Sequence, residues 1–189
     1  MLSVPDFAHS APWYLENLGL IPTDVQCVED GTPVLVFMRL NRGDIPADHH
    51  TVVLAQNLKR GLMHVAFETT DLDAIGQGQQ HLKSKGWRHQ WGIGRHILGS
   101  QIFDYWNDPY GTELEHYADG DVYTAGEPTG YHPLDPGNLY CWGDDAPPPP
   151  APGPFKMLLF VLSGGLKNMP PVLLKMRSLL SRPARPWLR

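Results

Sequence analysis

The sequence contains few cysteines and no long apolar run, and both shortages narrow the class of protein that it encodes. Cys27 and Cys141 are the only cysteines among 189 residues, which is too few for a disulfide framework, so a reducing compartment is expected. The longest apolar runs are far shorter than the roughly 20 residues that cross a bilayer. The first twenty residues also lack the basic and apolar pattern of a signal peptide. These absences predict a cytoplasmic protein and argue against a membrane partner.

Positive charge is also scarce, and it is unevenly distributed. The chain has 15 Lys and Arg against 20 Asp and Glu, a formal charge of −5, which provides no electrostatic basis for a nucleic-acid partner. From Phe155 onward, however, the sequence has seven basic residues and no acidic one. Residues 155–189 are therefore predicted to form a basic, apolar, helical tail that packs on the acidic body or on a second subunit of a homo-oligomer. A helix lying on an anionic membrane is the alternative.

Local patterns predict two helices and several short strands. Asp6 is typical of a helix N-cap and Gly19 of a helix end. A second helix is expected over residues 71–85, where apolar residues recur at helical spacing and Gly86 follows. Short β-branched runs between Gly, Asp and Pro residues predict strands, which cover residues 33–40, 50–55, 63–68, 101–106 and 112–117.

These elements form a repeat of about sixty residues. Residues 1–57 and 61–119 each contain a helix followed by strands, but the opening strand is cut short in the first half. The order predicts an α+β fold over residues 1–120, in which two modules enclose a cleft. Residues 121–154 are rich in Gly and Pro and are expected to form an extended linker.

Two residues far apart in the sequence suggest metal chemistry. His64 lies at the start of one apolar strand and Glu115 lies inside another. Strands of one sheet can bring a histidine and a carboxylate to one metal, and such a set with open positions suits non-haem Fe(II) oxygen chemistry. Leu114 and Tyr117 flank Glu115, and a carboxylate held in an inward position of a sheet needs a cation.

The second half of the chain resembles the last repeat of a type I extradiol ring-cleaving dioxygenase, in the vicinal oxygen chelate superfamily. The matching segments are Met63-His64-Val65-Ala66-Phe67, Gly94-Arg95-His96, Phe103-Asp104-Tyr105, Asp108-Pro109-Tyr110-Gly111 and Glu115-His116-Tyr117. Residues 4–57 resemble the preceding repeat. The resemblance implies βαβββ modules, an Fe(II) cofactor with Mn(II) as the alternative, and cleavage of a small aromatic diol by O₂.

The resemblance also implies roles for individual residues. His64 and Glu115 match the family's metal ligands, while His49, His96 and Tyr105 match its catalytic positions. A histidine near its ordinary pKa suits proton transfer at neutral pH. His50 competes directly with His49 for this role, because adjacent residues of a strand face opposite ways.

The family pattern is incomplete at the first ligand. The family takes its first metal histidine from the opening strand of the first of these two repeats, and the matching position would lie before Met1. His9 is a poor substitute because it lies on the expected helix. Two of three ligands predict weak metal binding and slow ring cleavage. A non-catalytic binding module and a glyoxalase-type isomerase are the alternative functions.

Overall fold

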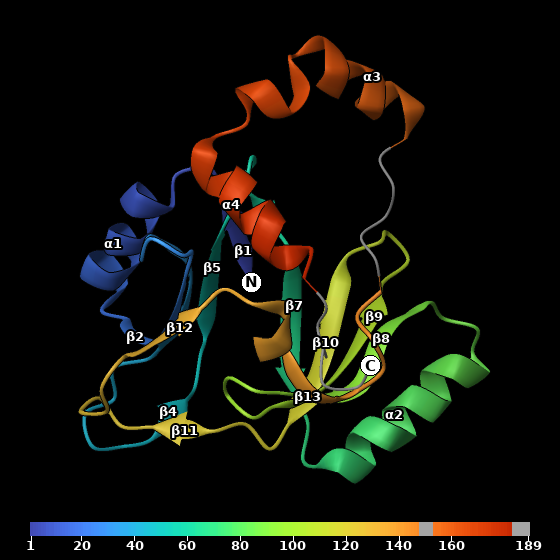
Figure 1. Cartoon of the computed structure of the whole chain (residues 1–189). Helices are drawn as coiled ribbons and strands as arrows, with labels where there is room; N and C mark the ends of the chain where they lie inside the picture. Colours follow the sequence, from blue (N-terminus) through green and yellow to red (C-terminus); the bar gives the residue numbers. More distant parts are fainter. Residues whose placement is uncertain (148–152, 183–189) are drawn as a thin grey trace.

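The computed structural model describes residues 1–147 and 153–182, which form two large sheets and one two-stranded sheet, with helices around them (Figure 1). The strands are β1 (Leu2–Val4), β2 (Ile21–Cys27), β3 (Pro33–Arg39), β4 (Ala47–Asp48), β5 (Val52–Gln56), β6 (Gly61–Leu62), β7 (His64–Glu68), β8 (His89–His96), β9 (Ile102–Asn107), β10 (Glu113–Ala118), β11 (Val122–Tyr123), β12 (Gly130–Pro133) and β13 (Tyr140–Gly143). The helices are α1 (Phe7–Leu18), α2 (Leu72–Ser84), α3 (Pro154–Leu162) and α4 (Pro171–Leu180), with 3₁₀ turns η1 (Pro136–Asn138) and η2 (Gly165–Asn168).

Each of the two large sheets contains one copy of the same strand topology. One has the strand order β12-β2-β3-β5-β1-β6 and the other β13-β8-β9-β10-β7. In each repeat the opening strand pairs in parallel with the last strand, β1 with β5 and β7 with β10. The prediction of an α+β fold built from paired βαβββ modules is therefore confirmed. The opening strand of the first module, β1, contains three residues.

Each module places its helix against its own sheet. The Asp6 carboxylate accepts a hydrogen bond from the His9 backbone at 3.0 Å and starts α1, and Gly19 ends it with a φ of 64°, which glycine adopts without strain. Phe7 of α1 is buried against apolar residues of β2, β3 and β5. Ile75 of α2 is buried in the same way in the second module. Both helices were predicted within about two residues of their observed ends.

The prediction of an extended linker over residues 121–154 is wrong for much of that segment. β12 pairs in parallel with β2, and β13 pairs with β8, so this segment widens both sheets. Edge strands are held by backbone hydrogen bonds and need no strong apolar pattern, which is why composition alone failed. The strands β2 and β8 were not anticipated either, because β2 carries Pro22 and polar residues and β8 carries two glycines. Residues 148–152 of the proline run lie outside the described part.

The two helices of the tail are placed differently. In α4, Leu179 is buried with Val28, Val34 and Leu134 of the body. By contrast, three apolar residues of α3 remain at the surface, since Met157, Leu158 and Val161 are 45%, 54% and 62% exposed. Figure 1 shows α3 projecting away from both sheets. Within the described parts of the chain, no helix is long and apolar enough to cross a membrane.

Candidate metal centre

A cavity of about 340 Å³ lies between the two modules. Its polar wall comes mainly from the second module, through β7, β8, β9 and β10. Its apolar wall includes Leu35 and Phe37 of β3 and Val53 of β5. The ionisable or hydroxyl-bearing side chains that line it are His50, His64, His96, Tyr105, Glu113 and Glu115.

His64 and Glu115 meet inside this cavity. They come from the neighbouring parallel strands β7 and β10, where Glu113 is paired with His64 and Glu115 with Ala66. The His64 Nε2 atom lies 3.4 Å from Glu115 Oε2, and both side chains are largely buried. The two predicted ligands therefore lie on one face of the sheet within a few ångströms.

The Glu115 carboxyl group has an unusual environment for an acid. Burial raises its pKa to about 8, and the nearby Tyr105 hydroxyl and Met1 ammonium group only partly offset this effect. Among the described residues its Oε1 atom has no hydrogen-bond partner, although it is buried. A buried carboxylate oxygen without a partner is costly unless a cation faces it.

The histidines of the cavity are neutral near physiological pH. Burial lowers the pKa of His64 to about 4, with further contributions from the Met1 ammonium group and His96. Burial likewise lowers the pKa of His96 to about 4, although its hydrogen bond to Leu139 opposes the shift. A neutral imidazole keeps the lone pair that a metal requires.

His96 and Tyr105 form a fixed pair beside Glu115. The Nδ1–H of His96 donates to the Leu139 carbonyl at 2.8 Å, so the neutral ring accepts at Nε2 from the Tyr105 hydroxyl at 3.1 Å. Burial, followed by the charge of Glu115, raises the Tyr105 pKa well above its usual value. Tyr105 therefore keeps its proton and acts as a donor.

The preference for His49 over His50 as the cavity-lining histidine is wrong. His50 lines the cavity, whereas His49 is fully buried behind it. The alternation of strand faces could not settle this choice, because both residues lie in the turn between β4 and β5. The ring nitrogens His49 Nδ1 and His50 Nδ1 lie 2.8 Å apart, so His49 contacts the cavity through its neighbour.

Glu113 is a cavity residue that the sequence reasoning missed. Its Oε1 atom lies 3.7 Å from His64 Nδ1, and burial raises its pKa. The run Glu113-Leu114-Glu115 does indicate that Glu113 lines the cavity, because residues two apart in a strand face the same side and Glu115 faces the cavity. Even so, the residues described here contain no group of three or more His, Cys, Asp and Glu side chains that could hold a metal.

The donor set fits a divalent cation only in part. A neutral His64 and the unpartnered Glu115 oxygen supply two ligands of the type that iron and manganese take, and the described residues offer no complete third position. His64 and Glu115 therefore fit as two members of a larger ligand set.

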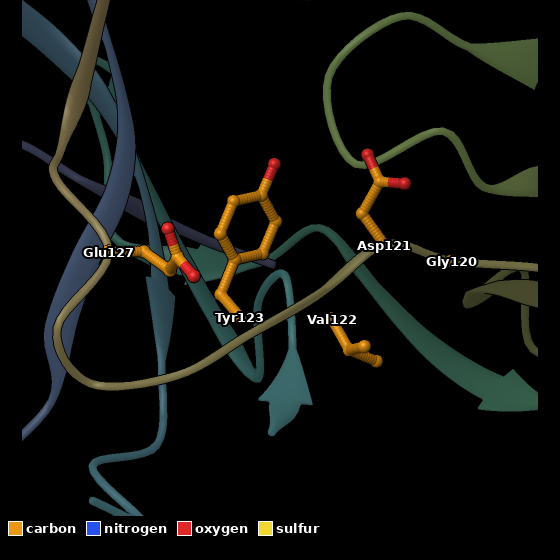
Figure 2. A pocket seen from close by; sticks show the side chains of 5 residues that line it. All are labelled: Gly120, Asp121, Val122, Tyr123 and Glu127. Carbon is orange, nitrogen blue, oxygen red and sulfur yellow. The ribbon is translucent and has the colours of Figure 1, made fainter. Parts of the chain in front are cut away.

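A second hollow, of about 520 Å³, lies along residues 120–127. Figure 2 shows the Tyr123 ring standing between Asp121 and Glu127. The ring packs at a centroid distance of 5.7 Å from His49. No histidine is among the described residues that line this hollow, so the chemistry of the candidate centre belongs to the cavity between the modules.

The paired modules and their buried histidine–carboxylate site define a class of protein, and sequence comparison agrees. Residues 1–116 match the model of the Glyoxalase/Bleomycin resistance protein/Dioxygenase superfamily. The chain belongs to this superfamily.

Individual relatives include ring-cleaving enzymes. The chain is 34% identical over 149 residues to metapyrocatechase 2 of Cupriavidus necator, covering 78% of this chain and 44% of that protein. Its fold is similar to the Mn(II)-bound glyoxalase of Novosphingobium aromaticivorans (TM-score 0.67, 24% identity, 81% of this chain and 49% of that one). It is also similar to homoprotocatechuate 2,3-dioxygenase of Brevibacterium fuscum with 3,4-dihydroxyphenylacetate (TM-score 0.66, 24% identity, 78% and 46%). The chain thus spans a little under half the length of these relatives.

Proposed function

We propose that this chain carries the metal site of an extradiol dioxygenase, which inserts O₂ into a catechol-type ring and opens it. The observations that carry the proposal both concern the Glu115 carboxyl group. Its buried Oε1 atom accepts no hydrogen bond among the described residues, and its Oε2 atom lies 3.4 Å from Nε2 of the neutral His64. The similarity to metapyrocatechase 2 supports the same reaction class.

His64 and Glu115 would hold Fe(II), with Mn(II) as the alternative. Bound there, such a metal would bring two adjacent ring oxygens and O₂ together and let charge pass between them. The low pKa of His64 supports this role, because its ring needs no deprotonation before binding.

The cavity suits a flat, partly polar ring. Leu35, Phe37 and Val53 provide an apolar wall, which favours an aromatic substrate over a strongly charged one. The Tyr105 hydroxyl lies on the polar side and keeps its proton, which it donates to His96 Nε2, so its oxygen can accept a hydrogen bond from a ring hydroxyl. The polar and apolar walls together favour one orientation of the ring.

Proton transfer in the cavity is assigned to His50 with His49 behind it. Ring cleavage requires a base for a catechol hydroxyl and later an acid, and histidine serves both roles. His50 lines the cavity and is held at the neutral state by burial, which lowers its pKa to about 3. His96 accepts from Tyr105 and fixes the orientation of that hydroxyl.

The test is Fe(II) binding and ring cleavage by two versions of the chain. We expect the 189-residue chain to bind Fe(II) weakly in calorimetry and to open catechol slowly or not at all, because the described residues complete only two ligand positions. The second version adds, before Met1, a strand that bears one histidine. The Met1 ammonium group donates a hydrogen bond to the His64 carbonyl at 2.8 Å. Because His64 begins β7, the added strand would run beside β7. Incorporation of both atoms of labelled O₂ into the opened ring is expected to rise.

Glu115→Ala in the extended version is the control. It removes the buried oxygen and should abolish both stoichiometric iron binding and ring cleavage. Stoichiometric iron and ordinary enzymatic rates in the 189-residue chain would contradict the ligand count. Undiminished cleavage in the Glu115→Ala variant would contradict the site itself.

A binding module without catalysis is the second candidate, and the incomplete ligand set favours it. In that case catechols should bind in the cavity of the extended version without being consumed. A glyoxalase-type isomerase would instead convert a thiol adduct of an α-keto aldehyde without using O₂. Substrate consumption measured with and without O₂ separates the three functions.

A further inference from the structure

Two buried glutamine side chains line the cavity between the modules. Gln26 and Gln101 are only 8% and 3% exposed, and both belong to the cavity wall. Among the described residues, no hydrogen bond reaches either side-chain amide. A buried amide normally has a partner, because an unmade hydrogen bond costs free energy. These two amides are therefore available to a molecule that enters the cavity.

The backbone brings the two amides to the cavity from different sheets. Gln26 pairs with Leu35 across β2 and β3, and Leu35 lines the cavity on the same sheet face. Gln101 precedes β9, and its carbonyl accepts from the His96 backbone at 2.9 Å, so it lies opposite another cavity residue. A Cβ atom at Gly120 would lie 3.1 Å from Gln101 Cγ, so this glycine leaves room for the side chain.

Neighbouring polar side chains are already occupied. On the same face of β2, Asp24 has its Oδ2 atom 2.7 Å from His49 Nε2 and its Oδ1 atom 2.7 Å from His132 Nε2. Asn138 provides another amide to the cavity wall, but its Nδ2 donates to the Pro133 carbonyl at 3.1 Å. The two glutamines differ from these residues because their hydrogen-bonding atoms are uncommitted.

The charges around the cavity disfavour an anionic ligand group. The described residues that line it include no Lys or Arg, and its three histidines are neutral because burial lowers their pKa. The Met1 ammonium group is bonded to the His64 carbonyl, and Glu113 and Glu115 add two acidic groups. A carboxylate here would lose its hydration without gaining a cation. An uncharged polar group avoids that cost.

The cavity is also larger than a bare aromatic ring requires. An apolar cavity of about 150 Å³ holds benzene, whereas this cavity has about 340 Å³. The additional volume has room for a substituent on the ring.

We propose that Gln26 and Gln101 form a subsite for an uncharged, hydrogen-bonding substituent of a catechol, with a carboxamide as the best match; this rests on the proposed function of the cavity. Each glutamine amide has an acceptor oxygen and two N–H donors. A carboxamide offers the same groups, so it can accept from one glutamine and donate to the other. A methyl substituent leaves both amides unpaired. A carboxylate offers acceptors alone and brings an unbalanced charge.

The test compares three catechols that differ in one substituent. Under anaerobic conditions, the metal-free full chain is titrated with 3,4-dihydroxybenzamide, 4-methylcatechol and 3,4-dihydroxybenzoate, and ¹⁵N NMR gives each Kd. We expect the benzamide to bind about tenfold or more tightly than the other two, because one additional buried hydrogen bond corresponds to roughly that factor. The side-chain NH₂ signals of Gln26 and Gln101 should shift with the benzamide.

Three leucine variants assign the preference to the subsite. Gln26→Leu and Gln101→Leu remove the hydrogen-bonding atoms at similar volume, and each should lower the ratio of benzamide to methylcatechol affinity by several fold. Gln77→Leu makes the same change at an exposed position of α2 and should leave the ratio unchanged.

Four outcomes would overturn the subsite. They are similar affinities for the benzamide and methylcatechol in the unaltered chain, tightest binding of the benzoate, no binding of any of the three, and a preference that survives both cavity substitutions. The first three need no variant, so they decide the proposal even if a variant does not fold.

The outcome is separable from that of the proposed function. Absence of O₂ incorporation by the extended version would reject the dioxygenase, while the affinities of the metal-free chain still decide the subsite. Ring cleavage together with equal affinities would reject the subsite and retain the dioxygenase. If both proposals hold, Gln101→Leu in the extended version should raise KM for the benzamide more than for 4-methylcatechol.

Discussion

At the scale of single residues, the candidate centre depends on one carboxyl group held away from water. Glu115 is 2% exposed, and burial rather than a charged neighbour dominates its raised pKa. A cation next to it would reverse this preference for the protonated form, since an adjacent positive charge favours a carboxylate. The same residue should therefore destabilise the metal-free protein at neutral pH.

Glu115→Gln is expected to stabilise the metal-free chain, and more so at higher pH. The folded pKa of Glu115, about 8, exceeds its ordinary value of 4.5, so the folded state binds this proton more tightly. Stability is then lost as pH rises from 4.5 through 8. At pH 7 the variant should gain about 2–4 kcal/mol. Thermal unfolding in chelator at pH 5 and pH 7 measures the difference.

Glu113→Gln is the matched control for this prediction. Glu113 lies on the same strand, but its side chain is 33% exposed, so its effect should be much smaller. A gain for Glu115→Gln that did not grow between pH 5 and pH 7 would show that Glu115 has an ordinary pKa.

At the scale of elements, one buried side chain helps to hold the segment that precedes β12 against the first module, in addition to the pairing of β11 with β4. Arg39 is fully buried and stays charged. Its guanidinium donates to the carbonyls of Thr124 and Glu127 at 3.1 and 2.6 Å and to Pro22 at 3.1 Å. This attachment positions β12, and therefore His132, against β2.

Arg39→Met should destabilise the protein by about 3–5 kcal/mol, because several buried carbonyls would lose their donor. Urea unfolding should show a lower midpoint, and hydrogen exchange of backbone amides should rise over residues 124–133. Arg39→Lys retains the charge with fewer donors, so its stability should lie between that of the unaltered protein and that of Arg39→Met. A loss below about 1 kcal/mol for Arg39→Met would mean that water replaces the guanidinium.

At the scale of the whole molecule, apolar contacts and charge pairs both attach α4 to the body. The Lys175 ammonium group pairs with the Asp30 carboxylate, and Arg182 Nη2 lies 2.7 Å from Glu29 Oε1. These pairs are exposed and contribute little each. Leu179 is 4% exposed among Val28, Val34 and Leu134, so the apolar contact supplies most of the stabilisation.

Leu179→Ala is therefore expected to cost about 2 kcal/mol or more, as for other buried leucines. Leu174→Ala is the matched control on the same helix, since Leu174 is 38% exposed and its truncation should cost far less. Lys175→Ala should have a small effect that disappears at high salt. Equal losses for the two leucine variants, measured by chemical unfolding, would contradict docking through Leu179.

The sequence by itself determined the features that depend on local chemistry. Asp6 and Gly19 mark the ends of α1 through a cap and a left-handed turn, and the helix-and-strand order gives both modules. The placing of His64 and Glu115 on strands of one sheet also followed from motif and strand pattern. Such features need only a few consecutive residues or one recurring motif.

Tertiary structure alone decided which side chains gather around the cavity. His50 rather than His49 lines it, because the turn before β5 removes the alternation that a strand would impose. Asp24 and His132 are 108 residues apart, and they meet only because β12 pairs with β2. That pairing is made by backbone hydrogen bonds common to all residues, so register and contact arise from the packed sheet and not from a sequence pattern.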